Sequence, residues 1–292
     1  MFEGSCVALV TPFSKGRVDE KKLRDLVEFH IAEGTQAIVP CGTTGESATL
    51  SHREHGRVIE VVVRAARKRI QVIAGTGSNS TREAVEMTRH AKSVGADACL
   101  LITPYYNKPT QTGLVHHFRT VARSVSVPIV LYNVPSRTGV NMLPATVIEL
   151  ARSEKNIVGI KEASGNLDQS SEIRKALPKD FSLYSGDDSL TLPILSLGGQ
   201  GVISVVANII PRDVAEMCDA WRSGDTDRAR ELHLKMFPLF KAVFIETNPI
   251  PVKTAMGRMR LCSSELRLPL VAMSAENRKK LESALRNYGV LK

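Results

Sequence analysis

A lysine at the end of a short apolar run is the first residue in this sequence that suggests chemistry. Residues 156–165 read Asn-Ile-Val-Gly-Ile-Lys-Glu-Ala-Ser-Gly, and the run before Lys161 is rich in β-branched side chains. A bounded run of this kind is typical of a fully buried strand. Burial disfavours the charged ammonium and leaves free amine, which a nucleophile that forms a Schiff base requires. The alternative is an exposed strand-end lysine that pairs with Glu162.

Two adjacent hydroxyl side chains, Thr43 and Thr44, lie between Gly42 and Gly45. Glycines leave backbone N–H groups accessible, and such groups bind carboxylates or phosphates. The segment therefore predicts an anion-binding loop, and the alternative is an ordinary Gly/Thr turn.

Aromatic and basic side chains follow two other apolar runs. Tyr132 ends the run 128–132, and Arg137 follows it, with a guanidinium group that can hold a carboxylate by two hydrogen bonds. Tyr105 and Tyr106 lie in a loop bounded by prolines. That pair indicates a subunit contact or a proton relay, and packing at the edge of the fold is the alternative.

The carboxylates Asp187 and Asp188 follow Gly186. They either bind a metal or cap the next helix, and we expect the cap. A lysine amine, tyrosine hydroxyls and an arginine, without a histidine–carboxylate triad, predict carbon–carbon chemistry on a keto acid through an iminium.

These side chains need a scaffold that brings them together. Eight short apolar runs alternate with helix-type patterns, and one residue per run, from Leu9 to Ile203, recurs every 20 to 35 residues. This alternation predicts an α/β fold, a (β/α)8 barrel (TIM barrel), instead of an open doubly wound sheet. Functional groups of such barrels lie at the carboxyl ends of the strands. The runs span residues 7–10, 36–39, 72–74, 98–102, 128–132, 157–160, 182–185 and 201–204.

The pattern changes after the eighth unit, which a helix over 211–222 completes. Residues 226–292 are helical in pattern, with breaks at 248–251 and 268–270. We expect a catalytic barrel over residues 1–225 and a helical region over 226–292 that packs on the barrel or on a neighbouring subunit.

Composition limits the partners and the compartment. The net charge is +9, but Lys and Arg are spread along the chain and do not form the clustered stripe typical of nucleic-acid binding. A positive field suits small anionic substrates better. No run approaches the roughly 20 apolar residues that cross a membrane. Five widely spaced cysteines argue against a disulfide framework and a zinc site, and they indicate a cytoplasmic protein.

The segments 42–46, 132–138 and 159–163 together resemble the signatures of the dihydrodipicolinate synthase family of pyruvate-dependent class I aldolases. The resemblance extends over the whole chain and includes 105–107, 185–188 and 248–253. It implies condensation of pyruvate with L-aspartate 4-semialdehyde, a step of diaminopimelate and lysine biosynthesis. It also implies a homotetramer built of tight dimers. No metal or cofactor is implied, because the lysine supplies the electron sink.

The resemblance also implies a role for each candidate residue. Lys161 would form the Schiff base and Tyr132 would donate and accept protons. Thr43 and Tyr106 would be partners of Tyr132 in a proton relay, and the adjacent subunit would contribute Tyr106. The substrate-binding residues would be Thr44 and Ile203 for pyruvate, Arg137 for the semialdehyde carboxylate, and Gly186.

Two other functions remain open at this point. Sialic-acid lyases resemble the chain in the lysine and the tyrosine, but they usually lack an arginine after Tyr132, so a lyase or aldolase for a longer sugar acid is the second hypothesis. The third is a barrel without catalytic activity that binds a metabolite or nucleic acid.

A regulatory site is a further hypothesis. Seven positions match those at which lysine-inhibited members of the family bind L-lysine at a subunit interface. There Glu83 would pair with ammonium groups, while the alternative makes His52 and His55 exposed first-turn residues of a helix. The positions are Ser47, Ala48, His52, His55, Asn79, Glu83 and Tyr105.

Overall fold

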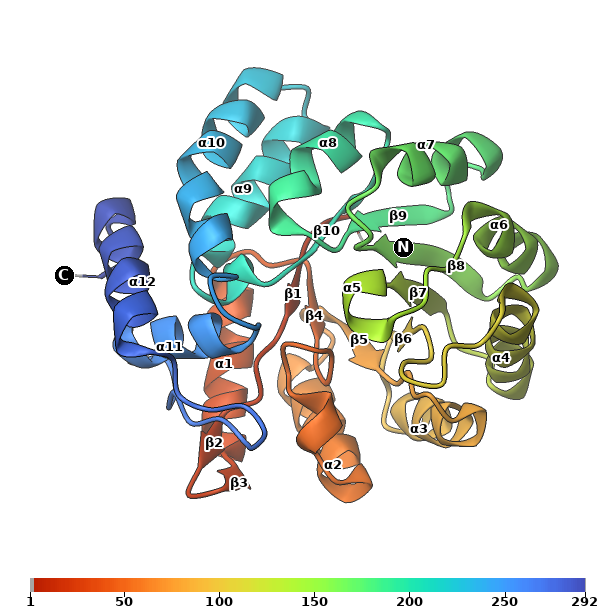
Figure 1. Ribbon diagram of the computed structural model, residues 1–292, viewed down its shortest axis with the longest axis horizontal. Coiled ribbons are helices and arrows are strands. Elements are labelled where there is room, and N and C mark those ends of the chain that lie inside the picture. The colour runs from red at the N-terminus through yellow and green to blue at the C-terminus, as the bar shows by residue number, and fades with distance from the viewer. Residues whose placement is uncertain (1–2, 292) are drawn as a thin grey trace.

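Eight parallel strands close into a barrel, which confirms the predicted (β/α)8 fold (Figure 1). The computed structural model describes residues 3–291, so residues 1–2 of the expected barrel region and Lys292 of the expected helical region lie outside it. Each strand pairs with its neighbours in chain order, and the first also pairs with the last. The strands are β1 (Gly4–Ala8), β4 (Ala37–Val39), β5 (Gln71–Gly75), β6 (Ala98–Ile102), β7 (Ile129–Asn133), β8 (Ile157–Glu162), β9 (Ser182–Ser185) and β10 (Gly201–Ser204).

Apolar side chains fill the molecule in two layers. Successive residues of a strand point to opposite faces, so a strand covered on both faces reads as a continuous apolar run. In β7, Val130 and Tyr132 belong to the cluster inside the barrel, whereas Ile129 and Leu131 pack toward the helices. The inner layer is therefore a packed core and the barrel is not a pore.

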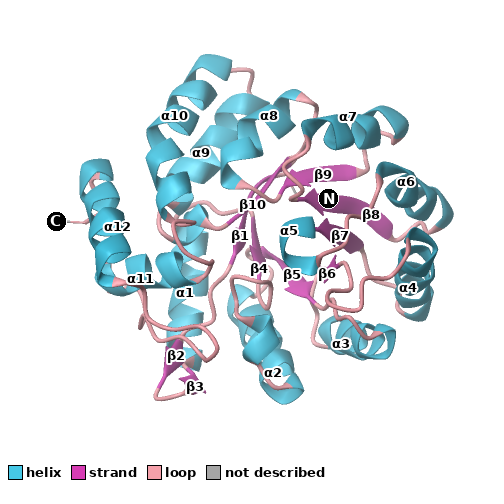
Figure 2. Ribbon diagram, in the orientation of Figure 1, coloured by secondary structure: helices cyan, strands magenta, loops and turns pink. Residues whose placement is uncertain are grey.

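Helices form a ring outside the strands (Figure 2). The helix-type patterns of the sequence predicted most of them, and α2 begins with a capping box formed by Ser51 and Glu54. The ring consists of α1 (Glu20–Ala32), α2 (His52–Ala66), α3 (Thr81–Ser93), α4 (Gln111–Ser124), α6 (Pro144–Ser153), α7 (Leu167–Ala176), α8 (Thr191–Ser196) and α9 (Pro211–Arg222).

Short elements occupy the loops that follow the strands at their carboxyl ends. A small hairpin of β2 (Phe13–Ser14) and β3 (Arg17–Val18) follows β1, and a short helix, α5 (Pro135–Thr138), follows β7. Single 3-10 turns follow β4, β9 and β10; these are η1 (Ser47–Thr49), η2 (Asp188–Leu190) and η3 (Val206–Asn208).

Two sequence-based expectations were wrong in detail. The first strand begins at Gly4 and ends at Ala8, earlier than the expected 7–10. Its first residues are small because the backbone of β1 approaches β10 closely: a Cβ on Gly201 would lie 1.9 Å from the Gly4 carbonyl oxygen. The expected break at 248–251 opens a helix, α11 (Ile250–Arg258), because Pro251 lies in the first turn, where proline is tolerated.

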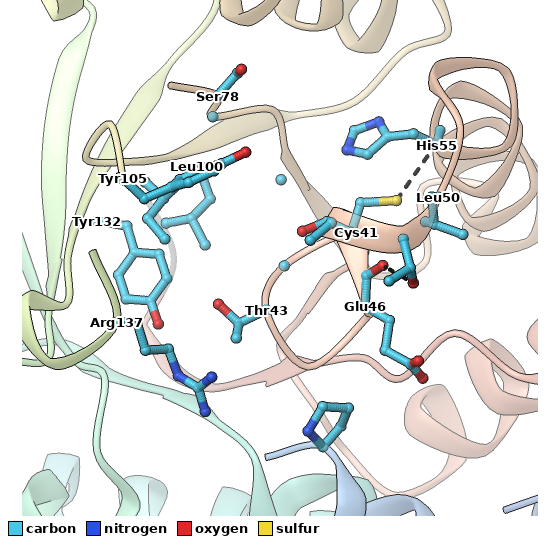
Figure 3. A pocket seen from close by; sticks show the side chains of 18 of the residues that line it. Cys41, Thr43, Glu46, Leu50, His55, Ser78, Leu100, Tyr105, Tyr132 and Arg137 are labelled. Carbon is cyan, nitrogen blue, oxygen red and sulfur yellow. Dashed lines mark hydrogen bonds between the residues drawn. The ribbon is translucent and has the colours of Figure 1, made fainter. Parts of the chain in front are cut away.

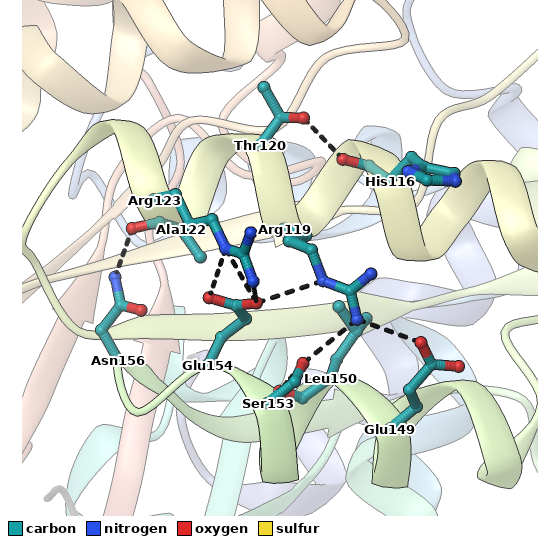
Figure 4. A network of polar contacts seen from close by, with 10 residues as sticks. All are labelled: His116, Arg119, Thr120, Ala122, Arg123, Glu149, Leu150, Ser153, Glu154 and Asn156. Atoms are coloured by element: carbon teal, nitrogen blue, oxygen red, sulfur yellow. Dashed lines mark hydrogen bonds and ion pairs between the residues drawn. The ribbon is translucent and has the colours of Figure 1, made fainter.

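A polar network anchors the amino end of β8, the strand that carries Lys161 (Figure 4). Arg119 and Arg123 on α4 both bind the nearly buried Glu154 carboxylate, with nitrogen–oxygen distances of 3.1 and 2.9 Å. The Asn156 side chain donates to the main-chain oxygen of Ala122 at 2.9 Å. Helix α4 and the start of β8 are thus held together.

The C-terminal helices pack on the barrel. Helix α10 (Thr226–Ala242) lies along α9, and α12 (Ala275–Tyr288) packs on α10 and α11 (Figure 1). In α11, the buried Lys253 reaches back to Glu46 in the loop after β4, with Nζ and Oε1 2.7 Å apart. Helices long and apolar enough to cross a membrane are absent from residues 3–291.

Candidate active site

Lys161 lies near the carboxyl end of β8 and is 5% exposed. Its neighbour Ile160 packs toward the helices, so the alternation of the strand turns Lys161 toward the barrel interior. There Lys161 Nζ lies 4.3 Å from the centre of the Tyr132 ring. Within residues 3–291, Lys161 forms no ion pair.

The alternative pairing of Lys161 with Glu162 is wrong, because Glu162 points to the opposite face of the strand. Its carboxylate accepts hydrogen bonds from Ser164 N at 2.7 Å, Gln169 Nε2 at 3.0 Å and Asn133 Nδ2 at 3.1 Å. Burial raises the pKa of Glu162, and these donors act in the opposite direction. Glu162 therefore does not pair with Lys161, whose side chain faces the barrel interior.

A cavity of about 180 Å³ brings most of the predicted catalytic and substrate-binding residues together. Neighbouring strands supply Tyr132 and Lys161, whose Cα atoms are partners in the register of β7 and β8. Figure 3 shows Tyr132, Arg137 and Thr43 pointing into a common space. The predicted residues that line this cavity are Thr43, Thr44, Tyr132, Arg137, Lys161 and Gly186.

The loop that carries Thr43 and Thr44 is held from several sides. The Thr11 hydroxyl donates to Gly45 O at 2.7 Å, and the Glu46 carboxylate binds Lys253 and the main-chain N–H of Arg267. A Cβ on Gly45 would lie 3.1 Å from the Leu9 oxygen, so glycine allows this close packing. The loop predicted to bind an anion is thus held in place by contacts with other parts of the chain.

Local backbone structure determines the positions of two further predicted substrate-binding residues, Arg137 and Gly186. Arg137 lies on α5, one turn of helix that begins at Pro135, and its Nη2 donates to Asn248 O at 3.3 Å. Gly186 lies against the end of β8, where its N–H donates to Glu162 O at 2.7 Å. A Cβ at this position would lie 2.5 Å from the Ala163 Cβ, so only glycine fits.

The two acids after Gly186 have different environments. Asp188 is buried and accepts from Ser204 Oγ at 2.5 Å and from the N–H groups of Val205 and Val206 at 3.1 Å. It therefore caps the turn that follows β10, not the next helix as expected. Asp187 lines the Lys161 cavity, and burial raises its pKa while the charge of Lys161 lowers it. Residues 3–291 contain no cluster of three or more metal-ligating acid, histidine or cysteine side chains.

Two of the predicted catalytic and substrate-binding residues, Ile203 and Tyr106, do not line the Lys161 cavity. The Ile203 side chain is fully buried in the core inside the barrel, together with Tyr132. Tyr106 is 88% exposed and has a φ of +72°. A non-glycine residue in that left-handed conformation is uncommon. Within one chain, Tyr106 is on the surface.

Asn248, Asp187 and Phe244 line the Lys161 cavity, although none of them was predicted as a substrate-site residue. Asn248 and Phe244 come from the C-terminal region, which we expected to pack on the barrel or on a neighbouring subunit. The Asn-Pro-Ile-Pro segment was interpreted as a break, and the resemblance over 248–253 gave Asn248 no role of its own.

A second cavity, of about 420 Å³, adjoins the first and shares Thr43, Tyr132 and Arg137 with it (Figure 3). Glu83 Oε2 accepts from Ser78 Oγ at 2.7 Å, and Glu83 Oε1 lies 4.0 Å from His52 Nε2. Six predicted effector residues line it, namely Ser47, Ala48, His52, His55, Glu83 and Tyr105.

Asn79, the seventh predicted effector residue, and the two histidines differ in their surroundings. Asn79 is not among the lining residues, and its main-chain oxygen accepts from Asn107 Nδ2 at 2.9 Å. His52 is exposed, but His55 is buried, and desolvation lowers its pKa to about 4. His55 is therefore neutral at pH 7, and the alternative of two exposed histidines is wrong for His55.

Comparison with known proteins gives consistent matches over the whole chain. The model of the dihydrodipicolinate synthetase family matches residues 1–288. A 4-hydroxy-tetrahydrodipicolinate synthase of Geotalea daltonii is 59% identical over 291 residues, which cover 100% of both chains.

Two solved structures are closely similar and carry ligands. A chloride-inhibited dihydrodipicolinate synthase of Acinetobacter baumannii, complexed with pyruvate, has a TM-score of 0.97 at 47% identity and covers 100% of both chains. The enzyme of Cyanidioschyzon merolae with lysine bound has a TM-score of 0.97 at 43% identity and covers 99% of both chains.

Proposed function

The chain belongs to the dihydrodipicolinate synthetase family, and we propose that it acts as a 4-hydroxy-tetrahydrodipicolinate synthase in diaminopimelate and lysine biosynthesis. Its substrates would be pyruvate and L-aspartate 4-semialdehyde. The observation that carries the proposal is the buried amine of Lys161, which shares one small cavity with Tyr132, Thr44 and Arg137.

The reaction begins on Lys161. Its free amine attacks the keto carbon of pyruvate and, with loss of water, forms an iminium. The iminium draws electrons from the adjacent methyl group, which loses a proton and becomes an enamine carbon. That carbon attacks the aldehyde of the semialdehyde and forms the new carbon–carbon bond. The substrate's own amino group then attacks the iminium carbon, closes the ring and displaces Lys161.

The surrounding residues bind substrates and move protons. Tyr132 is the proton donor and acceptor, because its ring lies beside Lys161 and its hydroxyl faces the space shared with Thr43 (Figure 3). The hydroxyl and the N–H of Thr44 hold the pyruvate carboxylate. Arg137 binds the carboxylate of the semialdehyde. Ile203 forms part of the core beneath the site.

The active site is shared between subunits in this proposal. Tyr106 is the third member of the proton relay, yet it is exposed in its own chain. It therefore completes the relay of a neighbouring subunit, and the assembly is a tetramer made of two such dimers. The five cysteines, Cys6, Cys41, Cys99, Cys218 and Cys262, are unpaired and buried, which favours a reducing cytoplasm.

L-Lysine is the proposed effector of the second cavity. Glu83 offers a carboxylate to an ammonium group, and His52 and Tyr105 add polar contacts around it. A similar enzyme has been solved with lysine bound. Addition of millimolar L-lysine to the steady-state assay is expected to reduce the rate, and an unchanged rate would remove the regulatory proposal.

A coupled assay with pyruvate and L-aspartate 4-semialdehyde tests the activity directly. We expect turnover with this pair and none with N-acetylneuraminate, the substrate of the sugar-acid alternative. Turnover of N-acetylneuraminate alone would favour that alternative. An absence of turnover together with salt-sensitive binding to polyanions would favour a binding module.

A further inference from the structure

Asn248 connects the C-terminal region to both substrate-binding groups of the cavity. Its side-chain Nδ2 donates to Thr44 Oγ1 at 3.0 Å, and its main-chain oxygen accepts from Arg137 Nη2 at 3.3 Å. Asn248 and Thr44 are 4% and 2% exposed. A hydrogen bond shielded from water in this way holds its direction well.

The direction of this hydrogen bond determines where the Thr44 proton can point. A hydroxyl carries one proton and accepts through its lone pairs. Because Asn248 donates to Thr44 Oγ1, the Thr44 proton has to point elsewhere. No atom of residues 3–291 accepts it, and Thr44 lines the Lys161 cavity. The proton is therefore available to an acceptor inside that cavity.

We propose that Asn248 is a positioning residue that holds the Thr44 hydroxyl with its proton directed at the carboxylate of the keto acid on Lys161. The inference rests on the proposed function, because it requires a keto acid in the cavity. The reverse arrangement, in which Asn248 accepts from Thr44, would present lone pairs to that carboxylate and repel it.

The second polar atom of the same side chain supports a role in ligand binding. Asn248 Oδ1 is buried and has no hydrogen-bond partner in the described part of the chain, and Asn248 lines both cavities. A buried acceptor without a hydrogen-bond partner lowers the stability of the folded state. Asparagine at this position is therefore explained better by what it does for a ligand than by its contribution to stability.

The substitution Asn248→Asp reverses the hydrogen bond with almost no change in shape. The new carboxylate only accepts, so the Thr44 proton turns toward it and away from the substrate. We expect the KM for pyruvate to rise about tenfold or more. The KM for the semialdehyde stays within about twofold, because Arg137 binds the main-chain oxygen of residue 248, which the substitution leaves in place.

Two controls separate this role from a structural one. Asn287→Asp adds the same charge on the exposed face of α12 and should change neither KM. Asn248→Ala frees the Thr44 hydroxyl to rotate and should raise the KM for pyruvate by about threefold. In a Thr44→Val background, Asn248→Ala should add less than about twofold, since the shared interaction is already gone.

The outcomes that overturn the inference are specific. One is a folded Asn248→Asp variant whose KM for pyruvate stays within twofold of the wild type. The other is a full effect of Asn248→Ala in the Thr44→Val background, and this cycle decides the question if Asn248→Asp does not fold. Borohydride trapping of pyruvate on wild-type Lys161 is run alongside. Its failure would overturn the proposed function itself, and the inference with it.

Discussion

Lys161 Nζ lies 4.3 Å from the centre of the Tyr132 ring, and the two residues are register partners on neighbouring strands. The phenol is thus held beside the amine by main-chain hydrogen bonds of the barrel. Tyr132→Phe keeps this ring and removes only the hydroxyl. We expect kcat to fall by about 10²- to 10³-fold, because proton transfer by a positioned side chain contributes at this level.

The same variant should still bind pyruvate, because Lys161 and Thr44 are unchanged. The measurement is steady-state kinetics together with the fraction of enzyme that borohydride traps at saturating pyruvate. A Tyr132→Phe enzyme with a kcat within threefold of the wild type would exclude Tyr132 as the proton carrier.

Tyr106 is exposed in its own chain, and the proposal that it acts in a neighbouring subunit can be tested with mixed variants. Lys161→Ala and Tyr106→Ala should each have little activity alone. When the two variants are mixed and allowed to exchange subunits, some sites receive both an intact Lys161 and an intact Tyr106 from the partner. We expect activity to return to a sizeable fraction of the wild-type rate. No recovery in mixtures shown to contain hybrid oligomers would contradict the shared site.

The buried ion pair between Lys253 and Glu46 connects the C-terminal region to the loop after β4. Lys253→Met leaves the Glu46 carboxylate buried without its counter-charge. Removing one partner of a buried pair destabilises a protein by about 3–5 kcal/mol. We expect a loss of this size in the free energy of unfolding, measured by urea denaturation.

The double variant Lys253→Met/Glu46→Gln should recover part of that loss, because the unpaired charge is gone. Lys92→Met, an exposed lysine on α3, provides the matched control. A Lys253→Met protein as stable as this control would show that the pair is unimportant.

Glu54 gives the fold a defined response to acid. Its carboxylate accepts from both terminal nitrogens of Arg267, at 2.9 and 2.6 Å, and from Ser51 N at 3.0 Å. The hydrogen bond from Arg267 is the main reason that the pKa of Glu54 falls to about 2. The folded state therefore holds the ionised form, and its stabilisation is present above the ordinary glutamate value and is lost as the pH falls toward 2.

Glu54→Gln should lower the melting temperature by about 2 °C at pH 7, a small effect because the pair is partly exposed. The difference from the wild type should shrink as the pH falls from 4.5 to 3. Glu172→Gln, at an exposed carboxylate of α7, is the control. A difference that stays constant from pH 7 to pH 3 would contradict the assignment.

The barrel could be predicted from the sequence because strands covered on both faces are apolar throughout, as in 128–132, and amphipathic helices separate them. The ends of strands and helices were harder to predict where close contacts of small residues determine them. The first strand starts at Gly4 because its backbone nearly touches Gly201. Hydrophobicity gives no sign of such a contact between residues that lie far apart in the sequence.

The candidate site was predictable where chemistry and strand ends coincide, as for Lys161, Tyr132, Thr43 and Arg137. Asn248 was missed because its importance comes from a hydrogen bond to Thr44 across 204 positions of the sequence. Asp188 was placed at the wrong helix for the same reason, since it caps a turn after the next strand. Long-range polar contacts of this kind leave no local pattern.

The central claim is that Lys161 forms a Schiff base with pyruvate, and reductive trapping tests it most directly. The protein is treated with borohydride in the presence and absence of pyruvate, and the modified peptide is identified by mass spectrometry. We predict one pyruvate-dependent adduct per chain, on Lys161, and none in Lys161→Ala. No adduct, or an adduct on another lysine such as Lys253, would contradict the account.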